Sequence, residues 1–229
     1  MYTRETFESK KLKRQLINKL IREMLSCGDR GSIVVLSGPA IEVQYNELKP
    51  LLRNKSDLLF VDNDVKMVKR ERLIERVKKL NDPRAKFYTG DIWEALKECY
   101  VKKQGWKYRH VFFNLDFCCT ASTLARDGLY EHLYWLAASK LPRRKGFWLA
   151  FTFCRWGDFT REWQKVPSKT IGIMDRVGWS LVISHIIPYA EKGENGKNKG
   201  GTNMVTMWFK FKWNNLKRRP SYAYMEAEV

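Results

Sequence analysis

The sequence predicts an α/β domain in which a mostly parallel sheet carries helices on both faces and ends in an antiparallel hairpin. Three observations lead to this prediction. Short apolar runs alternate with amphipathic stretches of helical length along residues 31–177. The last two apolar runs have no helical stretch between them. The acid Asp62, which ends the second run, follows the glycine turn at Gly38 by 24 residues, a separation close to that found in nucleoside-binding parallel sheets.

An amphipathic helix is predicted over residues 5–26, ahead of the first strand. Leu12, Leu16 and Leu20 recur at helical spacing, with lysines and arginines between them. Gly28 follows the pattern and is expected to end the helix. We expect the apolar face to pack on the sheet, which leaves the basic face for solvent or for phosphate groups.

Five strand–helix units are expected next, followed by two final strands. The strands are expected at residues 33–36, 58–61, 85–88, 111–115 and 147–153. The helices are expected at residues 42–52, 65–80, 92–103, 129–138 and 159–177. The two final strands, at residues 179–188 and 204–213, are joined by a polar, glycine-rich stretch. They are therefore predicted to pair as an antiparallel hairpin at the edge of the sheet.

A single domain is predicted for the whole chain of 229 residues. It divides into a basic helical segment in residues 1–30, a core in residues 31–213 and a basic tail in residues 214–229. No apolar run approaches the roughly 18 residues that a membrane helix needs, and the first residues have no apolar signal region. A cytoplasmic protein that does not associate with membranes is the expectation. The oligomeric state is left open.

The charge of the chain favours a polyanionic partner. The formal net charge is +18 at pH 7, which is large for one domain and is typical of proteins that bind nucleic acid. A merely well-solvated surface is the alternative. The five cysteines form no C-x-x-C pair and the three histidines are scattered, so reduced thiols and no metal site are expected. The absence of a G-x-x-x-x-G-K-[ST] segment excludes a P-loop enzyme.

Four segments closing the first four strands carry a resemblance to a known family. They are VVLSGP at residues 34–39, FVDNDVKMV at 60–68, FYTGD at 87–91 and HVFFNLDFC at 110–118. In order and spacing they are similar to the first four motifs of class I methyltransferases that use S-adenosylmethionine. The five strand–helix units and the closing hairpin fit the same family. The resemblance covers residues 30–213 and implies a Rossmann-like sheet, S-adenosylmethionine as cofactor and methyl transfer as the activity.

The resemblance also implies which residues hold the cofactor. Asp62 is expected to accept both ribose hydroxyls, and Asp91 to accept from the adenine amino group with Ile92 beside the ring. Gly38 lets the backbone approach the cofactor closely, and Glu42 is expected to meet its amino-acid end. Each acid has a structural alternative, since Asp62 and Asp91 each suit a helix N-cap and Glu42 suits an exposed helix position.

Asp116 and Cys118 are the candidate catalytic residues. Asp116 is expected at the carboxyl end of the fourth strand, where open α/β sheets bind ligands, and is expected to contact the methionine ammonium group or the substrate. Cys118 is a candidate nucleophile toward a pyrimidine ring, with a buried structural cysteine as the alternative. Family members that methylate the amino nitrogen of a base often carry two prolines here, and this chain has none.

A basic cluster and one tryptophan are predicted to contact the substrate. Arg143, Arg144 and Lys145 precede the fifth strand, and Trp156 follows it. The cations are expected to bind phosphates, and the indole of Trp156 to stack on a flipped or single-stranded base. Packing in the protein core is the alternative for Trp156.

Two functions from different classes are consistent with these features. The first is an S-adenosylmethionine-dependent methyltransferase that acts on DNA or RNA. The second is a catalytically inactive protein of the same fold that binds nucleic acid or a protein partner. The second interpretation rests on the first motif, where a single glycine, Gly38, is followed by Pro39, which has no amide donor. An NAD-type oxidoreductase fits less well, because it requires a fuller glycine fingerprint.

Overall fold

One seven-stranded sheet organises the chain, with the strand order β3-β2-β1-β4-β5-β7-β6. The computed structural model describes residues 11–36, 41–62, 67–102, 110–139, 141–143, 145–154, 161–190 and 203–214. Strands β1 to β5 run parallel to one another. Strand β7 runs antiparallel to both β5 and β6. The mostly parallel sheet and the antiparallel hairpin at its edge are therefore confirmed.

The observed strands lie close to the predicted ones, and most extend them by one or two residues. Their bounds are β1 Ser32–Leu36, β2 Leu58–Asp62, β3 Ala85–Thr89, β4 His110–Thr120, β5 Phe147–Cys154, β6 Trp179–Ala190 and β7 Asn203–Trp213. The largest difference is in β4, which continues beyond the predicted end at residue 115. The added residues are Asp116 to Thr120, of which Phe117 and Thr120 are of types that favour strands.

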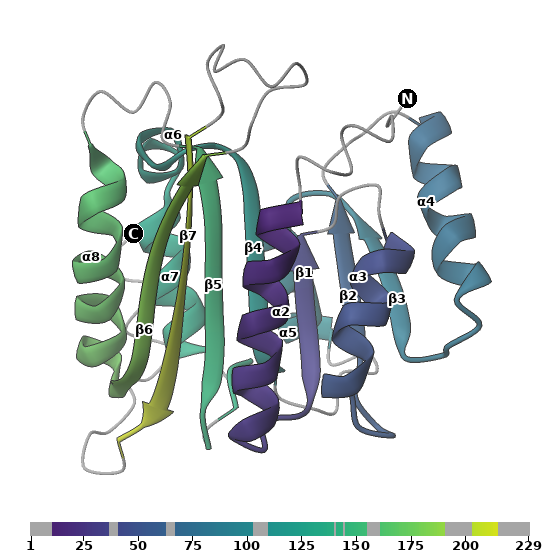
Figure 1. Cartoon of the computed structure of the whole chain (residues 1–229), viewed down its shortest axis with the longest axis horizontal. Coiled ribbons are helices and arrows are strands. Elements are labelled where there is room, and N and C mark those ends of the chain that lie inside the picture. The colour runs from purple at the N-terminus through teal and green to yellow at the C-terminus, as the bar shows by residue number, and fades with distance from the viewer. Residues whose placement is uncertain are drawn as a thin grey trace.

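Helices cover both faces of the sheet, as predicted (Figure 1). Their bounds are α2 Lys11–Ser26, α3 Ile41–Leu48, α4 Met67–Lys79, α5 Ile92–Lys102, α6 Ala121–Arg126, α7 Leu129–Ala138 and α8 Glu162–Val177. Helices α2, α3 and α4 lie on the face nearest the viewer in Figure 1, called the front face below. Helices α5 to α8 pack on the opposite face, called the back face. Residues 1–10, which include the start of the predicted first helix, lie outside the described residues.

Two hydrophobic cores form because neighbouring residues of a strand point to opposite faces. In β1, Ile33 and Val35 join the front core, whereas Val34 joins the back core. The same alternation in β5 sends Trp148 to the front and Leu149 to the back. Since both faces of the central strands are buried, these strands read as continuous apolar runs in the sequence.

The helices differ from the prediction in two places. The helix expected over residues 42–52 ends at Leu48 and continues as a short 3-10 turn, Lys49–Leu51. Pro50 explains this end, because proline has no amide to continue the α-helical hydrogen bonding. The short helix α6 was not predicted. Its start is marked by Thr120, whose hydroxyl oxygen accepts a hydrogen bond from the backbone amide of Thr123 at 3.2 Å.

A buried carboxylate ties the end of α2 to strands from the second half of the chain. Asp29 is 5% exposed. It accepts a hydrogen bond from Nε1 of Trp148 at 2.9 Å and pairs with Nζ of Lys210 at 2.9 Å. The guanidinium of Arg143 pairs with its other oxygen. We call these four residues the Asp29 cluster. It lies at the amino ends of the parallel strands and fixes the helix to β5 and β7.

Within the described residues, no helix is both long enough and apolar enough to span a membrane. In the same part of the chain, no three His, Cys, Asp or Glu side chains gather in a way that could hold a metal ion.

Candidate cofactor and substrate site

The carboxyl ends of β1 to β5 meet at one edge of the sheet, called the carboxyl edge below. From β1 the chain builds the sheet outward to β2 and β3, and then returns to place β4 on the other side of β1. Open α/β sheets bind ligands at the carboxyl edge beside such a reversal in strand order. Of the segments that follow β1, β2 and β5, residues 37–40, 63–66 and 155–160 lie outside the described residues. Gly38 and Trp156 are among them.

Asp62 ends β2 at the carboxyl edge, as predicted. The residue is 8% exposed, and its backbone carbonyl accepts a hydrogen bond from the amide of Gly90 at 3.0 Å. Thr89 is its register partner on β3. The end of β2 is therefore joined to the turn that leaves β3, and Asp62 and Asp91 lie on adjacent strand ends. Ribose binding by Asp62 stays a prediction.

Gly90 is at a position where only glycine fits. Its φ of +145° is rarely adopted by other residues, and a Cβ atom here would lie 2.9 Å from Cε1 of Tyr88. The glycine lets the chain turn sharply from β3 into α5. This close approach gives the GD pair at residues 90–91 a structural reason beside its resemblance to a methyltransferase motif.

Asp91 caps helix α5. Its Oδ1 accepts hydrogen bonds from the backbone amides of Trp93 at 2.8 Å and Glu94 at 3.1 Å. The capping alternative for Asp91 is thus observed. It fixes the orientation of the carboxylate and does not exclude contact between Oδ2 and a ligand. Ile92 is only 2% exposed and belongs to the back core, so it offers little surface to an adenine ring in this conformation.

Glu42 lies in the first turn of α3 and is directed toward the neighbouring helix. Its Oε1 is 3.9 Å from Nε of Arg76 on α4, and its side chain is 48% exposed. An ion pair this long and this exposed contributes little to stability. Glu42 remains accessible near the carboxyl edge, and its contact with a cofactor stays a prediction.

The sequence predicted Asp116 at the carboxyl end of β4, but the strand continues beyond it to Thr120. It lies inside the strand, paired in register with Thr152 of β5, and the pairing becomes irregular between Asp116 and Thr120. Such bulges often re-aim side chains beside functional sites. Thr152 pairs in turn with Thr206 of β7, and their hydroxyl oxygens are 2.9 Å apart. A polar row of three residues therefore crosses β4, β5 and β7 near the carboxyl edge.

Asn114 is a candidate site residue that the sequence analysis missed as such. It lies two residues before Asp116 on the same face of β4 and is 6% exposed. Its Oδ1 accepts no hydrogen bond from the described residues. A buried amide oxygen without a donor is costly, about 1–3 kcal/mol, so it calls for a partner. In the sequence the signal is a polar residue within the apolar strand pattern of residues 111–115.

The cysteine prediction is not resolved by the structure. The side chain of Cys118 lies outside the described part of the chain. Its neighbours Phe117 and Cys119 are partly buried against the back core, and neither Cys119 nor Cys154 forms a disulfide with another described residue.

The predicted substrate cluster does not lie with the acids. Arg143 and Lys145 precede β5, so they lie at its amino end, at the opposite edge of the sheet from Asp62 and Asp116. Arg143 is also held in the Asp29 cluster, whereas Lys145 is exposed. The prediction placed these residues among the loops around the site, and this placement was wrong because those loops follow the parallel strands. Arg144 lies outside the described residues.

Solved structures of low sequence identity share this architecture. The crystal structure of M. jannaschii TYW2 in complex with AdoMet matches with a TM-score of 0.51 and 10% identity, over 93% of this chain and 78% of that one. A Clostridium thermocellum protein named as an rRNA methylase matches with a TM-score of 0.50 and 12% identity, over 82% of this chain and 90% of that one. No protein-family model and no curated protein sequence matches the chain. At such identities the likeness establishes the shared fold.

Proposed function

We propose that this chain, which has the class I methyltransferase fold, is an S-adenosylmethionine-dependent methyltransferase that acts on RNA in the cytoplasm. The observation that carries the proposal is the grouping of Asp62, Gly90 and Asp91 on adjacent strand ends at the carboxyl edge. The net charge of +18 supports a nucleic-acid substrate. The rRNA-methylase name of one of the two structures reported above supports RNA over DNA.

The described residues fit the cofactor. A nucleoside needs acceptors for its ribose hydroxyls and its amino group, and Asp62 and Asp91 provide carboxylates on neighbouring strand ends. Gly90 keeps the backbone between them free of a side chain. Asn114 provides an amide oxygen that accepts no hydrogen bond from the described residues, which suits an ammonium or amide donor.

Each residue has a distinct role in this proposal. S-adenosylmethionine, when bound, supplies an electrophilic methyl group. Asp62 and Asp91 orient the nucleoside end by hydrogen bonding. Asn114 and Asp116 lie at the strand nearest the reversal of strand order, where the methionine end and the substrate meet. Asp116 is the candidate to accept a proton from the attacking nitrogen or oxygen of the substrate.

Calorimetry with S-adenosylmethionine and S-adenosylhomocysteine tests the cofactor site. We expect binding of both by the wild-type chain and a loss of at least tenfold in affinity for Asp62→Ala, which removes the acceptor for two hydroxyl groups. The matched control is Asp175→Ala, because Asp175 is an exposed acid near the end of α8, a helix that packs on the back face. It is expected to bind the cofactor like the wild type.

Transfer of a radiolabelled methyl group then tests the reaction and its substrate. Total RNA is expected to be labelled and DNA is not. The proposal would be ruled out if the wild-type chain gave no heat with either cofactor form and Asp62→Ala left methyl transfer unchanged. That result would favour the inactive nucleic-acid-binding protein, for which the single glycine of the first motif is the supporting feature.

A further inference from the structure

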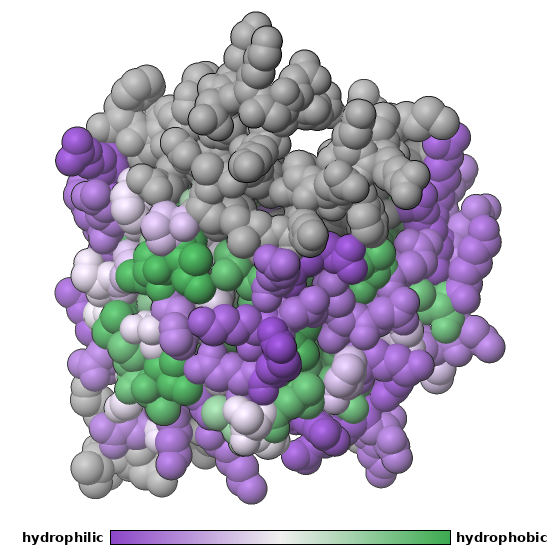
Figure 2. Space-filling model, viewed as in Figure 1, coloured by the Kyte–Doolittle hydropathy of each residue, from purple (hydrophilic) through white to green (hydrophobic). Residues whose placement is uncertain are grey.

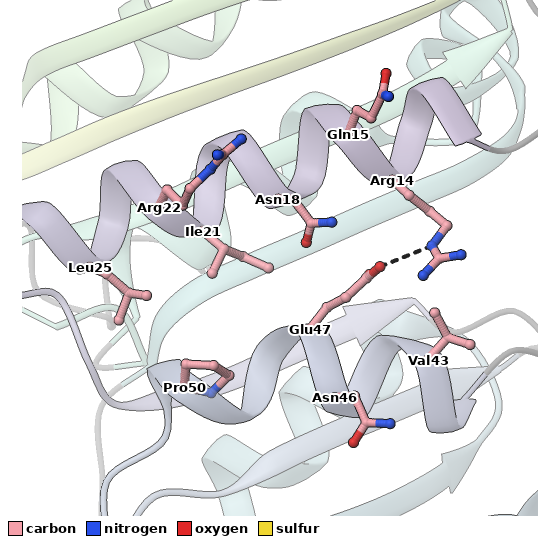
Figure 3. A pocket seen from close by; sticks show the side chains of 10 residues that line it. All are labelled: Arg14, Gln15, Asn18, Ile21, Arg22, Leu25, Val43, Asn46, Glu47 and Pro50. Atoms are coloured by element: carbon pink, nitrogen blue, oxygen red, sulfur yellow. Dashed lines mark hydrogen bonds and ion pairs between the residues drawn. The ribbon is translucent and has the colours of Figure 1, made fainter.

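A groove separates helices α2 and α3 on the front face (Figure 3). Its volume is about 700 Å³. Ile21, Leu25 and Val43 form an apolar floor, Arg14 reaches across the groove to Glu47, and Arg22 stands on α2 with its guanidinium directed away from α3. Figure 3 shows both helices running in the same direction along the groove, so its two ends differ. One end lies near the start of both helices, and the other near their ends.

A second hollow continues the groove past the end of α2. It has a volume of about 760 Å³ and shares Leu25 with the first. Arg30, Arg53 and Lys55 line it. We call the two hollows together the α2–α3 channel below. Helix α2, which borders both, begins near the carboxyl edge and ends at the amino edge of the sheet (Figure 1).

The α2–α3 channel is strongly positive. Arg22, Arg30, Arg53 and Lys55 are exposed, and within the described part of the chain no acid pairs with any of them. The acid Glu47 is held by Arg14 at 3.0 Å. Four cations therefore face solvent along one channel, and Figure 2 shows a largely hydrophilic surface over these helices. This charge is complementary to a polyanion.

The lining favours the backbone of a nucleic acid over its bases. None of the described residues that line the channel is aromatic, so bases have no ring on which to stack. The amides of Asn18 and Asn46 can donate to phosphate or hydroxyl oxygens. The apolar floor is narrow and suits the carbon faces of sugars. Since α2 has 16 residues, it is about 24 Å long, enough for several nucleotides.

We infer that the α2–α3 channel holds the phosphate backbone of the RNA, next to the nucleotide that reaches the carboxyl edge. The identity of the polymer as RNA rests on the function proposed above. The positive charge of the channel is independent of that function. The substrate contact then lies not at Arg143 and Lys145, at the amino end of β5, but on a surface that begins near the carboxyl edge.

Fluorescence anisotropy with a labelled single-stranded RNA of 12 nucleotides, without cofactor, tests this inference. The double variant Arg22→Gln/Arg53→Gln removes one cation from each part of the channel and leaves a shorter, uncharged polar side chain in its place. We expect about tenfold weaker binding at low salt. The slope of log affinity against log salt is expected to fall by about 1.4, since each lost phosphate contact on a single strand removes about 0.7.

The control removes the same charge from the back face. Lys97 on α5 and Arg176 on α8 are exposed cations on helices of that face, and Lys97→Gln/Arg176→Gln is expected to bind RNA within twofold of the wild type. Equal losses in the two double variants would mean that net charge alone drives binding, and would overturn the inference. So would tighter binding of a glutamate-rich helical peptide than of the RNA.

The two proposals fail separately. If only the channel variant loses RNA binding and the protein gives no heat with S-adenosylmethionine, the channel is supported and the methyltransferase function is rejected. If the channel variant binds RNA as well as the wild type and the protein binds the cofactor, RNA binding in the channel is rejected and the methyltransferase function is supported.

Discussion

Asp82 joins two side chains that are distant in the sequence. Its Oδ2 accepts hydrogen bonds from the hydroxyl of Tyr45 at 2.6 Å and from Nη2 of Arg84 at 2.6 Å. Its Oδ1 accepts from the backbone amide of Arg84 at 2.9 Å. The hydrogen bonds from Arg84 hold the pKa of Asp82 well below its usual range, against the opposing effect of burial. The cluster fixes α3 to the turn that leads into β3.

Loss of the carboxylate should therefore destabilise the fold. We expect Asp82→Asn to lower the free energy of unfolding by about 2 kcal/mol, because it removes charge-assisted hydrogen bonds. Tyr45→Phe, which removes only a hydroxyl, should cost about 1 kcal/mol. Urea unfolding at pH 7 gives both values. The double variant should cost less than the sum, and strictly additive costs would show that the two residues are not coupled.

Glu162, in the first turn of α8, is another buried carboxylate. It is 7% exposed. Its Oε1 accepts hydrogen bonds from Nζ of Lys169 at 2.7 Å and from the hydroxyl of Tyr130 at 2.8 Å, and its Oε2 accepts from Lys165 at 3.2 Å. These bonds, with that from Lys169 the strongest influence, lower the pKa of Glu162 from 4.5 to about 2.

This pKa shift predicts a loss of stability in acid. The unfolded chain binds the proton near pH 4.5, whereas the folded chain keeps Glu162 ionised down to about pH 2. The stabilisation is therefore complete above pH 4.5 and is lost as the pH falls from 4.5 to 2. We expect a loss on the order of 2 kcal/mol, reduced by the partial exposure of the lysines.

Thermal unfolding of the wild type and of Glu162→Gln between pH 7 and pH 2 checks this prediction. The difference in stability between the two proteins should shrink below pH 4.5. Burial lowers the pKa of His110 to about 3, so its own effect extends from pH 6.5 downward, but it is present in both proteins and cancels in the difference. A difference that stays constant with pH would contradict the prediction.

At the scale of elements, β6 is an edge strand that carries Pro188 and a bulge between Leu181 and Ile183 but no charge against pairing. None of its 12 residues, Trp179–Ala190, is Asp, Glu, Lys or Arg. Leu181, Val182 and Ile186 are the large exposed hydrophobic residues of the described chain, at 37%, 52% and 44% exposure. Figure 2 shows hydrophobic surface over this part of the sheet. Edge strands commonly carry charges that prevent pairing with other chains.

A charge on β6 should therefore reduce self-association. We expect Val182→Lys to lower the concentration dependence of light scattering and to change the free energy of unfolding by less than about 0.5 kcal/mol, as is usual for a surface site. Gln164→Lys adds the same charge at an exposed position on α8, and should leave self-association unchanged. Equal effects of both variants would indicate that net charge, and not the edge of the sheet, controls association.

The elements that sequence patterns predicted well are those whose burial repeats regularly. Leu129–Ala138 was predicted with its observed bounds, because Leu129, Leu133 and Leu136 follow one buried helical face. Strand β4 was predicted too short, since Asp116 looks like a strand end. Its continuation depends on pairing with β5 and on a bulge, neither of which is local to the sequence.

For the whole molecule, the order of strands and helices was predictable from the sequence. Which side chains lie close together in space was only partly predictable. The acids Asp62 and Asp91 lie at the carboxyl edge as expected, because parallel strands bring their carboxyl ends together. Arg143 was misplaced because charge alone does not show that an arginine is held by a buried acid such as Asp29. The α2–α3 channel joins residues from separate helices and loops, so no local pattern predicts it.

The Asp29 cluster has a consequence for how the protein is made. Helix α2 is translated before the strands that hold it: Asp29, just after its end, is held by Trp148 and Lys210, and its Glu23 accepts a hydrogen bond from Trp208 at 3.3 Å. Domains usually fold as units during synthesis. Here the contacts of α2 with Trp208 and Lys210 cannot form until β7 has been translated. Helix α2 is thus fully secured only long after it is made, and a nascent chain stalled before β7 would be a substrate for chaperones.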